Sequence, residues 1–395
     1  MQRIYSYLNT AVKIIGEYEG IEPFSSFLKK YFSQYKKYGS NDRKQITHLC
    51  FCYFRLGKSA PPNPPQRGGL EERILTGLFL CSSEPNEIFE KLQPEWNKQI
   101  DLPVSHKLLI INDSLLIETI FPWKDELSNE INYEKFCGSF FIQPDLFLRL
   151  RPGCENAVRK KLSGSKIHFT EINESCLSLR NNSKIENIIE LDKEAVVQDY
   201  NSQGTGTIFK TAINHLPSVI HAWDCCAASG GKSLLLYDIN STIDLTVSDI
   251  RESILMNLKK RFARAGIKKY RSFIADLSRP DFKIQNSKFE LIICDAPCTG
   301  SGTWNRTPEQ LYFFNEKKIR EYSSLQKQIV SNVVPCLKEN GFLIYITCSV
   351  FKKENEEIAD FVENNFKLKL IKMELLKGYD KKADTMFVTL FKNIL

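Results

Sequence analysis

The chain has 395 residues, 42% of them hydrophobic and 26% charged, which predicts a globular protein of two or three domains. It contains no run of about 18 apolar residues, so we expect no membrane-spanning helix and no membrane partner. The amino terminus lacks the apolar segment of a secretory signal, which favours a cytoplasmic protein. Twelve cysteines without a Cys-x-x-Cys pair predict free thiols in a reducing compartment and no metal site.

The formal net charge of +7 is concentrated near the amino terminus, where residues 1–60 hold ten Lys and Arg but only four Asp and Glu. Aromatic residues lie between the basic ones, at Tyr31, Phe32, Tyr35, Tyr38, Tyr53 and Phe54. Basic and aromatic side chains together suit phosphate contact and base stacking. A solvated helix face above an aromatic core explains the same composition, and composition alone favours that simpler interpretation.

Apolar residues recur at helical spacing through residues 1–58, which predicts helices there. A stretch rich in Pro and Gly follows at 61–69 and predicts a loop. The helical pattern resumes over 71–80 and 105–120, although the short apolar run at 108–111 fits a strand equally well. The first part of the chain is therefore expected to be all helical.

A different pattern begins near residue 137. Short apolar runs at 146–150 and 167–169 lie on either side of a basic helical segment at 154–162, which predicts a small α+β unit. We therefore expect a helical domain over residues 1–125 and a small α+β subdomain, also suited to RNA binding, over residues 126–205.

After residue 200 the pattern becomes strand, turn and helix in repetition. This alternation predicts an α/β fold, a doubly wound Rossmann-like sheet over residues 206–395. Ligands in such sheets bind beyond the carboxyl ends of the strands, where Asp224, Asp249, Asp295 and Cys348 fall. The expected strands are 219–225, 245–249, 271–275, 289–295 and 341–347, and the expected helices are 232–239, 252–265, 318–337 and 355–364.

Small residues fill the first of these turns, between a strand and a helix, where a ligand can approach the backbone closely. Asp249 follows about 20 residues after the glycines, at the position where an acid binds ribose hydroxyls. A nucleoside-containing cofactor is therefore predicted, although a turn without a ligand remains an alternative. A triphosphate-binding loop is disfavoured, because it requires glycine in place of the first turn residue. The turn consists of Cys226, Ala227, Ala228, Ser229, Gly230, Gly231 and Lys232.

Two cysteines each follow a hydrophobic strand-like run, Cys298 in Asp295-Ala-Pro-Cys-Thr-Gly and Cys348 in Thr347-Cys-Ser. A thiol that emerges from a strand end into a loop is placed to react. Methylation of cytosine C5 requires such a thiolate to add at C6, and a second acid or base assists the later release. Taken singly, a cysteine in this setting is more often a small buried apolar residue. We interpret Cys225 and Cys294 as packing residues of that kind.

Four motifs occur together in one order: Cys226-Ala-Ala-Ser-Gly-Gly-Lys232 with Asp249, then Asp276, then Asp295 through Gly302, then Tyr345-Ile-Thr-Cys-Ser349 with Glu354-Asn-Glu356. They resemble the S-adenosylmethionine-dependent RNA cytosine-C5 methyltransferases of the RsmB/Fmu/Sun type. The resemblance covers residues from about 120 to 395. Two departures stand out, namely Ser229 where the family usually has Pro, and residues 303–308 where it commonly has two adjacent basic residues.

The resemblance implies roles for these residues. Cys348 resembles the nucleophile that attacks C6, Cys298 the thiol required for product release, and Asp295 a group that hydrogen-bonds the pyrimidine ring or the cofactor edge. Residues 226–232 would surround S-adenosylmethionine, with Lys232 orienting cofactor or substrate. Asp249 would bind the ribose hydroxyls and Asp276 the adenine amino group, while Asp276 as a cap of residues 277–279 is the alternative.

Residues 39–48 and the aromatic helix after them resemble, more weakly, the NusB-like helical RNA-binding module of the methyltransferase that acts on small-subunit ribosomal RNA. This resemblance implies 16S ribosomal RNA as substrate, with transfer RNA as the alternative, and indicates no obligate protein partner. A DNA cytosine methyltransferase is disfavoured. Those enzymes use a Pro-Cys thiol, in the position that resembles Cys298, as nucleophile and do not need the thiol in Thr347-Cys-Ser. A non-catalytic RNA-binding or ribosome-assembly factor on the same fold would not require both thiols, the glycine turn and the acids together.

Overall fold

The computed structural model describes residues 2–59, 69–112, 116–282, 284 and 288–394. The chain divides into two compact units. The helical unit comprises residues 1–125, 132–143 and 304–315, and the sheet unit comprises residues 126–131, 144–303 and 316–395. The loop expected at 61–69 lies, except for Gly69, outside the described residues.

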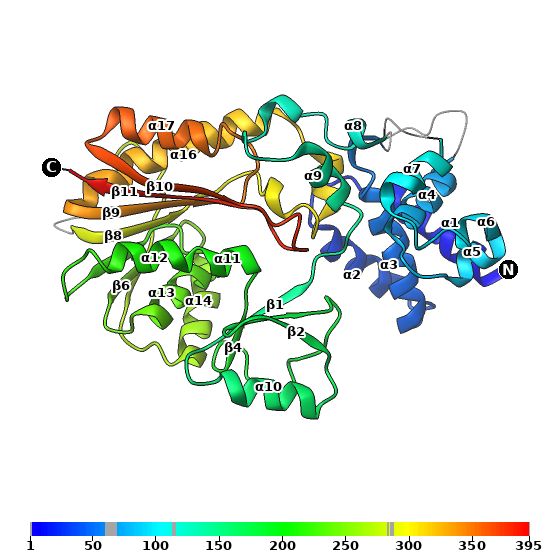
Figure 1. Cartoon of the computed structure of the whole chain (residues 1–395), viewed down its shortest axis with the longest axis horizontal. Helices are drawn as coiled ribbons and strands as arrows, with labels where there is room; N and C mark the ends of the chain where they lie inside the picture. The colour runs from blue at the N-terminus through cyan, green and yellow to red at the C-terminus, as the bar shows by residue number, and fades with distance from the viewer. Residues whose placement is uncertain (1, 60–68, 113–115, 283, 285–287, 395) are drawn as a thin grey trace. The chain divides into compact units, whose positions relative to one another are not determined.

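The helical unit is all helical, as the spacing of apolar residues predicts. Residues 108–111, which fit either helix or strand, belong mainly to a helix, α7. In the core of the unit α3 packs against α1 and α4 (Figure 1). The helices are α1 Gln2–Glu17, α2 Phe24–Gln34, α3 Ser40–Phe54, α4 Leu70–Cys81, α5 Glu87–Leu92, α6 Pro94–Asn97, α7 Val104–Ile110, α8 Leu116–Ile120, α9 Tyr133–Ser139 and α15 Pro308–Phe313, with a 3-10 turn η1 Gly57–Ser59.

An aromatic cluster joins the amino-terminal helices of this unit to the distant segment 304–315. The ring of Tyr18 lies 4.8 Å from that of Phe24 and 5.3 Å from that of Phe313, between ring centres. Phe54 completes the cluster, 5.0 Å from Phe24. Phe54, one of the aromatic residues that lie among the basic ones in the sequence, is therefore a core residue. This agrees with the interpretation of a solvated helix face above an aromatic core.

The sheet unit begins with the small α+β part that the sequence predicts. Four antiparallel strands lie in the order β2-β3-β1-β4, and one helix, α10, packs against them through Val158 and Leu162. The elements are β1 Leu146–Leu150, α10 Glu155–Gly164, β2 Phe169–Asn173, β3 Cys176–Leu179 and β4 Ala195–Val197.

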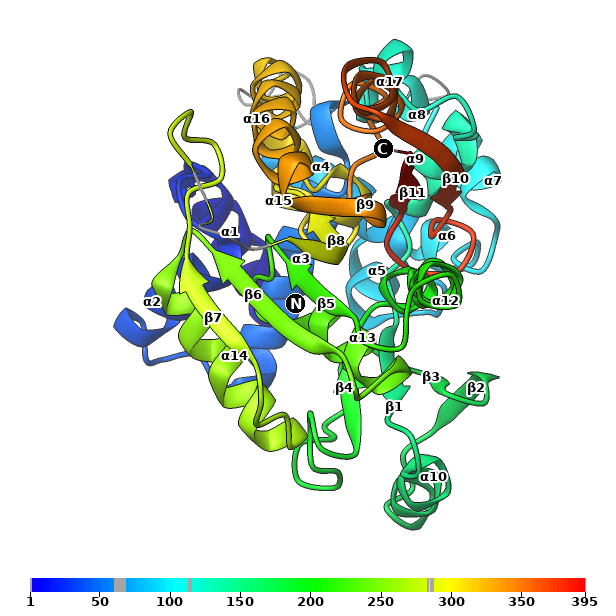
Figure 2. The same cartoon turned by 90° about the vertical axis from the view of Figure 1, so that its left-hand side faces the viewer.

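The larger sheet has seven strands in the order β10-β11-β9-β8-β5-β6-β7 (Figure 2). Strands β5 to β9 pair in parallel, as predicted, whereas β11 pairs antiparallel with both β9 and β10. The hairpin of β10 and β11 was not predicted. The strands are β5 His221–Asp224, β6 Asp244–Asp249, β7 Arg271–Ile274, β8 Phe289–Asp295, β9 Leu337–Thr347, β10 Leu368–Leu376 and β11 Met386–Asn393.

Helices cover both faces of this sheet (Figure 1). Neighbouring residues of a strand point to opposite faces, so that Ile293 packs with the helices of one face and Cys294 with those of the other. One face carries α12 Gly206–Ile213, preceded by α11 Tyr200–Gly204, with α13 Gly231–Ile239 and α14 Glu252–Ala265; the other carries α16 Lys317–Val333 and α17 Glu356–Asn365. The fold is thus the Rossmann-like α/β architecture that the sequence predicts.

The strand order reverses at β5. From β5 the chain proceeds to β6 and β7 on one side and later returns to β8 and β9 on the other. The loops that follow β5 and β8 therefore diverge and leave a crevice at the carboxyl ends of the strands. Within the described residues, no helix has both the length and the apolar character that crossing a membrane requires.

Candidate functional site

A cavity of about 480 Å³ lies where the sheet order reverses. Seven of the residues singled out from the sequence line it: Cys226, Ala228, Asp249, Asp276, Asp295, Cys298 and Cys348. Its wall is completed by Cys225, Ile250, Arg251, Ala275, Leu277, Ser278, Ala296, Pro297, Tyr322, Leu325 and Ile329. Ala227, Ser229, Gly230, Gly231 and Lys232 are not among the lining residues. The fold therefore gathers motifs more than 120 residues apart at one place.

The turn after β5 is held by Asp249 at the end of β6. The backbone N–H of Ala228 donates to Oδ2 of Asp249 at 3.0 Å, and that of Arg251 donates to Oδ1 at 2.9 Å. Ala228 has a φ of 46°, an uncommon conformation for a residue with a side chain, which this hydrogen bond helps to hold. Asp249 thus shapes the turn, and its two oxygens also accept from the guanidinium of Arg251, at 3.1 Å to Oδ1 and 3.4 Å to Oδ2.

Gly230 is required where the turn enters α13. Its φ is 84°, in the left-handed region, and a Cβ placed there would lie 2.8 Å from a ring carbon of Phe262. At Gly231, by contrast, a Cβ would meet no atom within 4 Å. Gly230 is therefore required by its backbone conformation and by its packing against α14, whereas Gly231 is not.

Asp276 lies at the cavity wall and also organises its own loop. Its Oδ1 accepts hydrogen bonds from the backbone N–H of Ser278 at 3.0 Å and from the Ser278 hydroxyl at 2.6 Å. These bonds lower the pKa of Asp276, so it stays a carboxylate at neutral pH. The capping interpretation therefore has a geometric basis, and the position on the cavity wall is compatible with a ligand contact as well.

Two charged side chains beneath the cavity act on its lining. Lys232 is buried, and its Nζ donates to Oδ2 of Asp295 at 3.2 Å and to the hydroxyl of Ser202 at 2.9 Å. Asp224 is fully buried, accepts a hydrogen bond from the Ser233 hydroxyl at 2.5 Å, and has its pKa raised to about 7 by burial. Lys232 thus orients Asp295, and Asp224 lies below the turn.

The two predicted reactive cysteines face each other. Sγ of Cys298, in the loop after β8, lies 3.3 Å from Sγ of Cys348, in the loop after β9, and both cysteines are free. The hydrogen bond with Cys348, followed by burial, raises the pKa of the Cys298 thiol well above its usual value. Either sulfur can be the donor of this hydrogen bond, which joins the two thiol loops.

Sequence reasoning assigned no role to Glu354, although it lies in one of the quoted motifs. This fully buried carboxylate accepts from the backbone N–H of Thr299 at 2.8 Å, the Thr299 hydroxyl at 2.6 Å and the Ser349 hydroxyl at 2.7 Å. Gln326 adds a fourth bond at 3.2 Å. Because Thr299 and Ser349 directly follow the two cysteines, Glu354 fixes the distance between the two thiol loops.

The sheet order, its crevice and the cavity at the carboxyl ends of the strands define a Rossmann-like α/β domain with a site large enough for a small-molecule ligand. Residues 218–391 match the family model described as 16S rRNA methyltransferase RsmB/F. The matched segment is less than half of the chain and holds the glycine turn and both cysteines, so this part of the chain is similar to that family.

Two curated relatives are the ribosomal RNA small subunit methyltransferases B of Photorhabdus laumondii and Shewanella oneidensis. The chain is 32% identical to the first over 152 residues and 31% identical to the second over 181 residues. These matches cover 37% and 46% of this chain but only 34% and 41% of the relatives. The chain thus spans less than half the length of the curated relatives it matches.

Solved structures extend the likeness in fold. The crystal structure of PH0851 aligns over 98% of both chains, with a TM-score of 0.69 and 18% identity. A methyltransferase homolog protein from Pyrococcus horikoshii aligns over 68% of this chain and 92% of its own, with a TM-score of 0.56 and 19% identity. At such identities the likeness concerns the fold alone.

Proposed function

We propose that this protein methylates C5 of cytosine in RNA, with S-adenosylmethionine as the methyl donor and a covalent bond between Cys348 and C6 as the intermediate. The observation that carries the proposal is the 3.3 Å contact between the sulfurs of Cys298 and Cys348 at the edge of the cavity. A methyltransferase domain that acted on a stronger nucleophile would need neither thiol.

The cavity suits a nucleoside-containing methyl donor. Its volume of about 480 Å³ lies within the range of small-molecule sites, and its wall combines apolar residues with the three carboxylates of Asp249, Asp276 and Asp295. Asp249 would take the ribose hydroxyls in place of the guanidinium of Arg251, and Asp276 the adenine amino group. The turn at 226–232 would hold the methionine part, and the bound donor supplies an electrophilic methyl group.

The residues of the chain account for the covalent steps. Cys348 loses its thiol proton to a base and, as thiolate, donates a sulfur lone pair to C6, so that the electrons of the ring double bond become available at C5 to take the methyl group. The C5 proton then leaves to a base, the double bond re-forms, and the Cys348 sulfur departs as thiolate. Cys298 is within reach to assist this release, and Asp295, oriented by Lys232, stabilises the pyrimidine ring.

The order of roles follows the resemblance of the Thr347-Cys-Ser motif to the nucleophile of the family. The structure adds that the two sulfurs lie 3.3 Å apart, so both thiols can reach the same ring. The hydrogen bond with Cys348 and burial raise the pKa of the Cys298 thiol, so this thiol can supply a proton at the release step.

We further propose RNA of the small ribosomal subunit as the substrate and the cytoplasm as the location. The relatives act on that RNA by name, and the basic excess of residues 1–60 suits contact with phosphates. The NusB-like module over residues 1–125 and the α+β subdomain over residues 126–205 would contribute to binding. Transfer RNA is the alternative substrate.

Single substitutions of the two thiols test the chemistry. Cys348→Ala should abolish methylation and form no adduct, whereas Cys298→Ala should accumulate a covalent enzyme–RNA complex that resists denaturing gel electrophoresis. Bisulfite sequencing of RNA from cells with and without the gene identifies the methylated cytidine. An adduct in Cys348→Ala but none in Cys298→Ala would refute the assignment, and unchanged cytidine protection in the deletion strain would favour a non-catalytic RNA-binding factor.

A further inference from the structure

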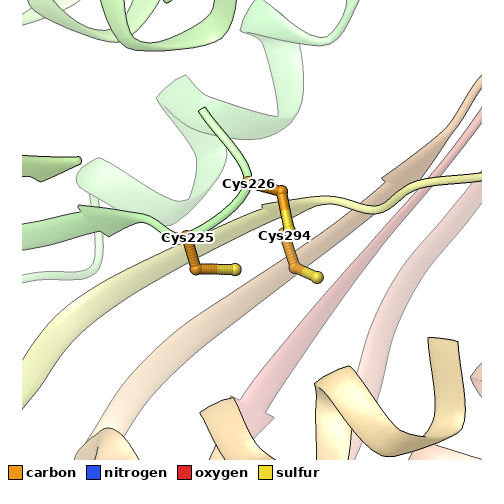
Figure 3. Close-up of side chains that lie close together, drawn as sticks. All are labelled: Cys225, Cys226 and Cys294. Carbon is orange, nitrogen blue, oxygen red and sulfur yellow. The ribbon is translucent and has the colours of Figure 1, made fainter. Parts of the chain in front are cut away.

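Three further sulfur atoms converge beside the cavity, apart from the reactive pair. The Sγ atoms of Cys225, Cys226 and Cys294 all lie within 4.8 Å of one another. Figure 3 shows the three side chains together, where the end of β5 meets β8. The backbone N–H of Cys225 donates to the carbonyl of Ile293 at 2.9 Å, which fixes the two segments side by side. Parallel pairing of β5 and β8 thus brings together cysteines that are 69 positions apart in the sequence.

The turn after β5 is what gives two adjacent cysteines a common partner. Successive side chains of a strand point to opposite faces, but β5 ends at Asp224 and the chain turns at once. The backbone N–H of Ala227 donates to the carbonyl of Ser248 at 2.8 Å and holds this turn. Cys225 and Cys294 are fully buried, whereas Cys226 is partly exposed. Because Cys225 and Cys226 also line the cavity, an ion has a path to the cluster.

The spacing and chemistry of the three sulfurs match a soft metal ion. Metal–sulfur bonds of about 2.3 Å place the ligand sulfurs of a three- or four-coordinate ion about 4 Å apart, which is within the upper limit of 4.8 Å on the separations here. Thiolates select zinc, cadmium and monovalent copper over hard cations.

We propose that Cys225, Cys226 and Cys294 bind one thiophilic metal ion with a filled d shell, such as Zn²⁺, at the inner wall of the cavity. Each sulfur donates a lone pair to the ion, and binding releases the protons that the thiols carry; no electron is transferred. The site does not depend on the proposed methyl transfer. This proposal differs from the expectation that the protein has no metal site, because that expectation rested only on the absence of a Cys-x-x-Cys pair in the sequence.

Cadmium is a suitable probe, because its bonds to thiolates absorb in the ultraviolet. The background is the full chain with Cys298→Ser and Cys348→Ser, since that pair of sulfurs could capture the same ion. Titration should give one Cd²⁺ per chain, counted by native mass spectrometry and displaced by Zn²⁺. Adding Cys294→Ser should weaken binding by at least about tenfold. Adding Cys336→Ser, a cysteine on the 3-10 turn after α16, should leave it unchanged.

Folding is controlled separately. Each variant is compared by circular dichroism and thermal unfolding, and Cys226→Ser replaces Cys294→Ser if the buried substitution unfolds the protein, because Cys226 is the more exposed ligand. Loss of the absorption band in a folded Cys226→Ser or Cys294→Ser variant supports the site. Full retention of the band in either folded variant, or no stoichiometric band in the background protein, overturns it.

Discussion

At the scale of single residues, the site depends on side chains that touch no ligand. Glu354 connects the loop after Cys298 to the loop after Cys348 with charge-assisted hydrogen bonds, which are the stronger class. The two thiols therefore hold their separation because a third, buried group accepts from both loops. Sequence reasoning found the thiols through their motifs, but this connection exists only once the loops are folded together.

Glu354→Gln should separate the thiols without dissolving the fold. Glutamine places an amide NH₂ where donors now point, so at least one bond to Thr299 or Gln326 is lost, at about 1.5–3 kcal/mol. We expect about a tenfold to hundredfold fall in the rate of adduct formation, measured in single turnovers. Glu356→Gln is the control, because Glu356 accepts from Ser128 and contacts neither loop through a described hydrogen bond. Equal rates in both variants would contradict the role of Glu354.

Asp224 gives the domain a stability that depends on pH. Burial raises its pKa from 3.8 to about 7, so the folded state favours the neutral acid. Between pH 4 and pH 7 the unfolded chain has lost this proton while the folded chain keeps it, so the free energy of unfolding falls by about 1.4 kcal/mol for each pH unit. Asp224→Asn, which keeps an oxygen for Ser233, should remove this loss. In denaturant unfolding, Asp224→Asn should have a higher free energy of unfolding than the unsubstituted protein at pH 8 but not at pH 4.5. An equal difference at both pH values would refute the argument.

At the scale of elements, the parallel sheet was predictable because its strands, except for β7 at the edge, are short apolar runs followed by a helix. The hairpin of β10 and β11 was missed because no helix separates the two strands, so they fall outside the repeat of strand, turn and helix; the mixture of charged and apolar side chains over 368–376 is the signal that could have revealed β10. The cluster of Cys225, Cys226 and Cys294 escaped prediction for a related reason. It arises from the pairing of β5 with β8, a contact that sequence spacing does not reveal.

The turn from β5 into α13 allows a matched pair of substitutions. Gly230→Ala forces a side chain into the left-handed region and against Phe262, so it should lower the free energy of unfolding by about 1–3 kcal/mol and weaken S-adenosylmethionine binding. Gly231→Ala, in open space at the start of a helix, should be neutral or slightly stabilising. Calorimetry with the cofactor and thermal unfolding give both values. Similar losses in the two variants would contradict the distinction between the glycines.

At the scale of the whole molecule, RNA binding should depend on salt and on the charge of the helical unit. Lys36 and Lys37 are exposed just after α2, and Lys37 lies over the ring of Tyr38. If both contact phosphates of single-stranded RNA, Lys36→Glu with Lys37→Glu should lower the slope of log affinity against log salt by about 1.4. Lys268→Glu with Lys269→Glu, an equal charge reversal after α14, is the control. Equal losses would show that affinity follows net charge rather than a particular surface.

The helical unit is not one continuous stretch of sequence. Immediately after Gly302, whose N–H donates to the carbonyl of Cys348 and whose carbonyl accepts from Thr385, the chain enters this unit for residues 304–315 and then returns to the sheet unit. There Leu311 is fully buried, and its side chain lies 2.8 Å from where a Cβ at Gly57 would be. During synthesis, residues 1–143 leave the ribosome long before α15. The helical unit can therefore complete its fold only after most of the sheet unit has been synthesised.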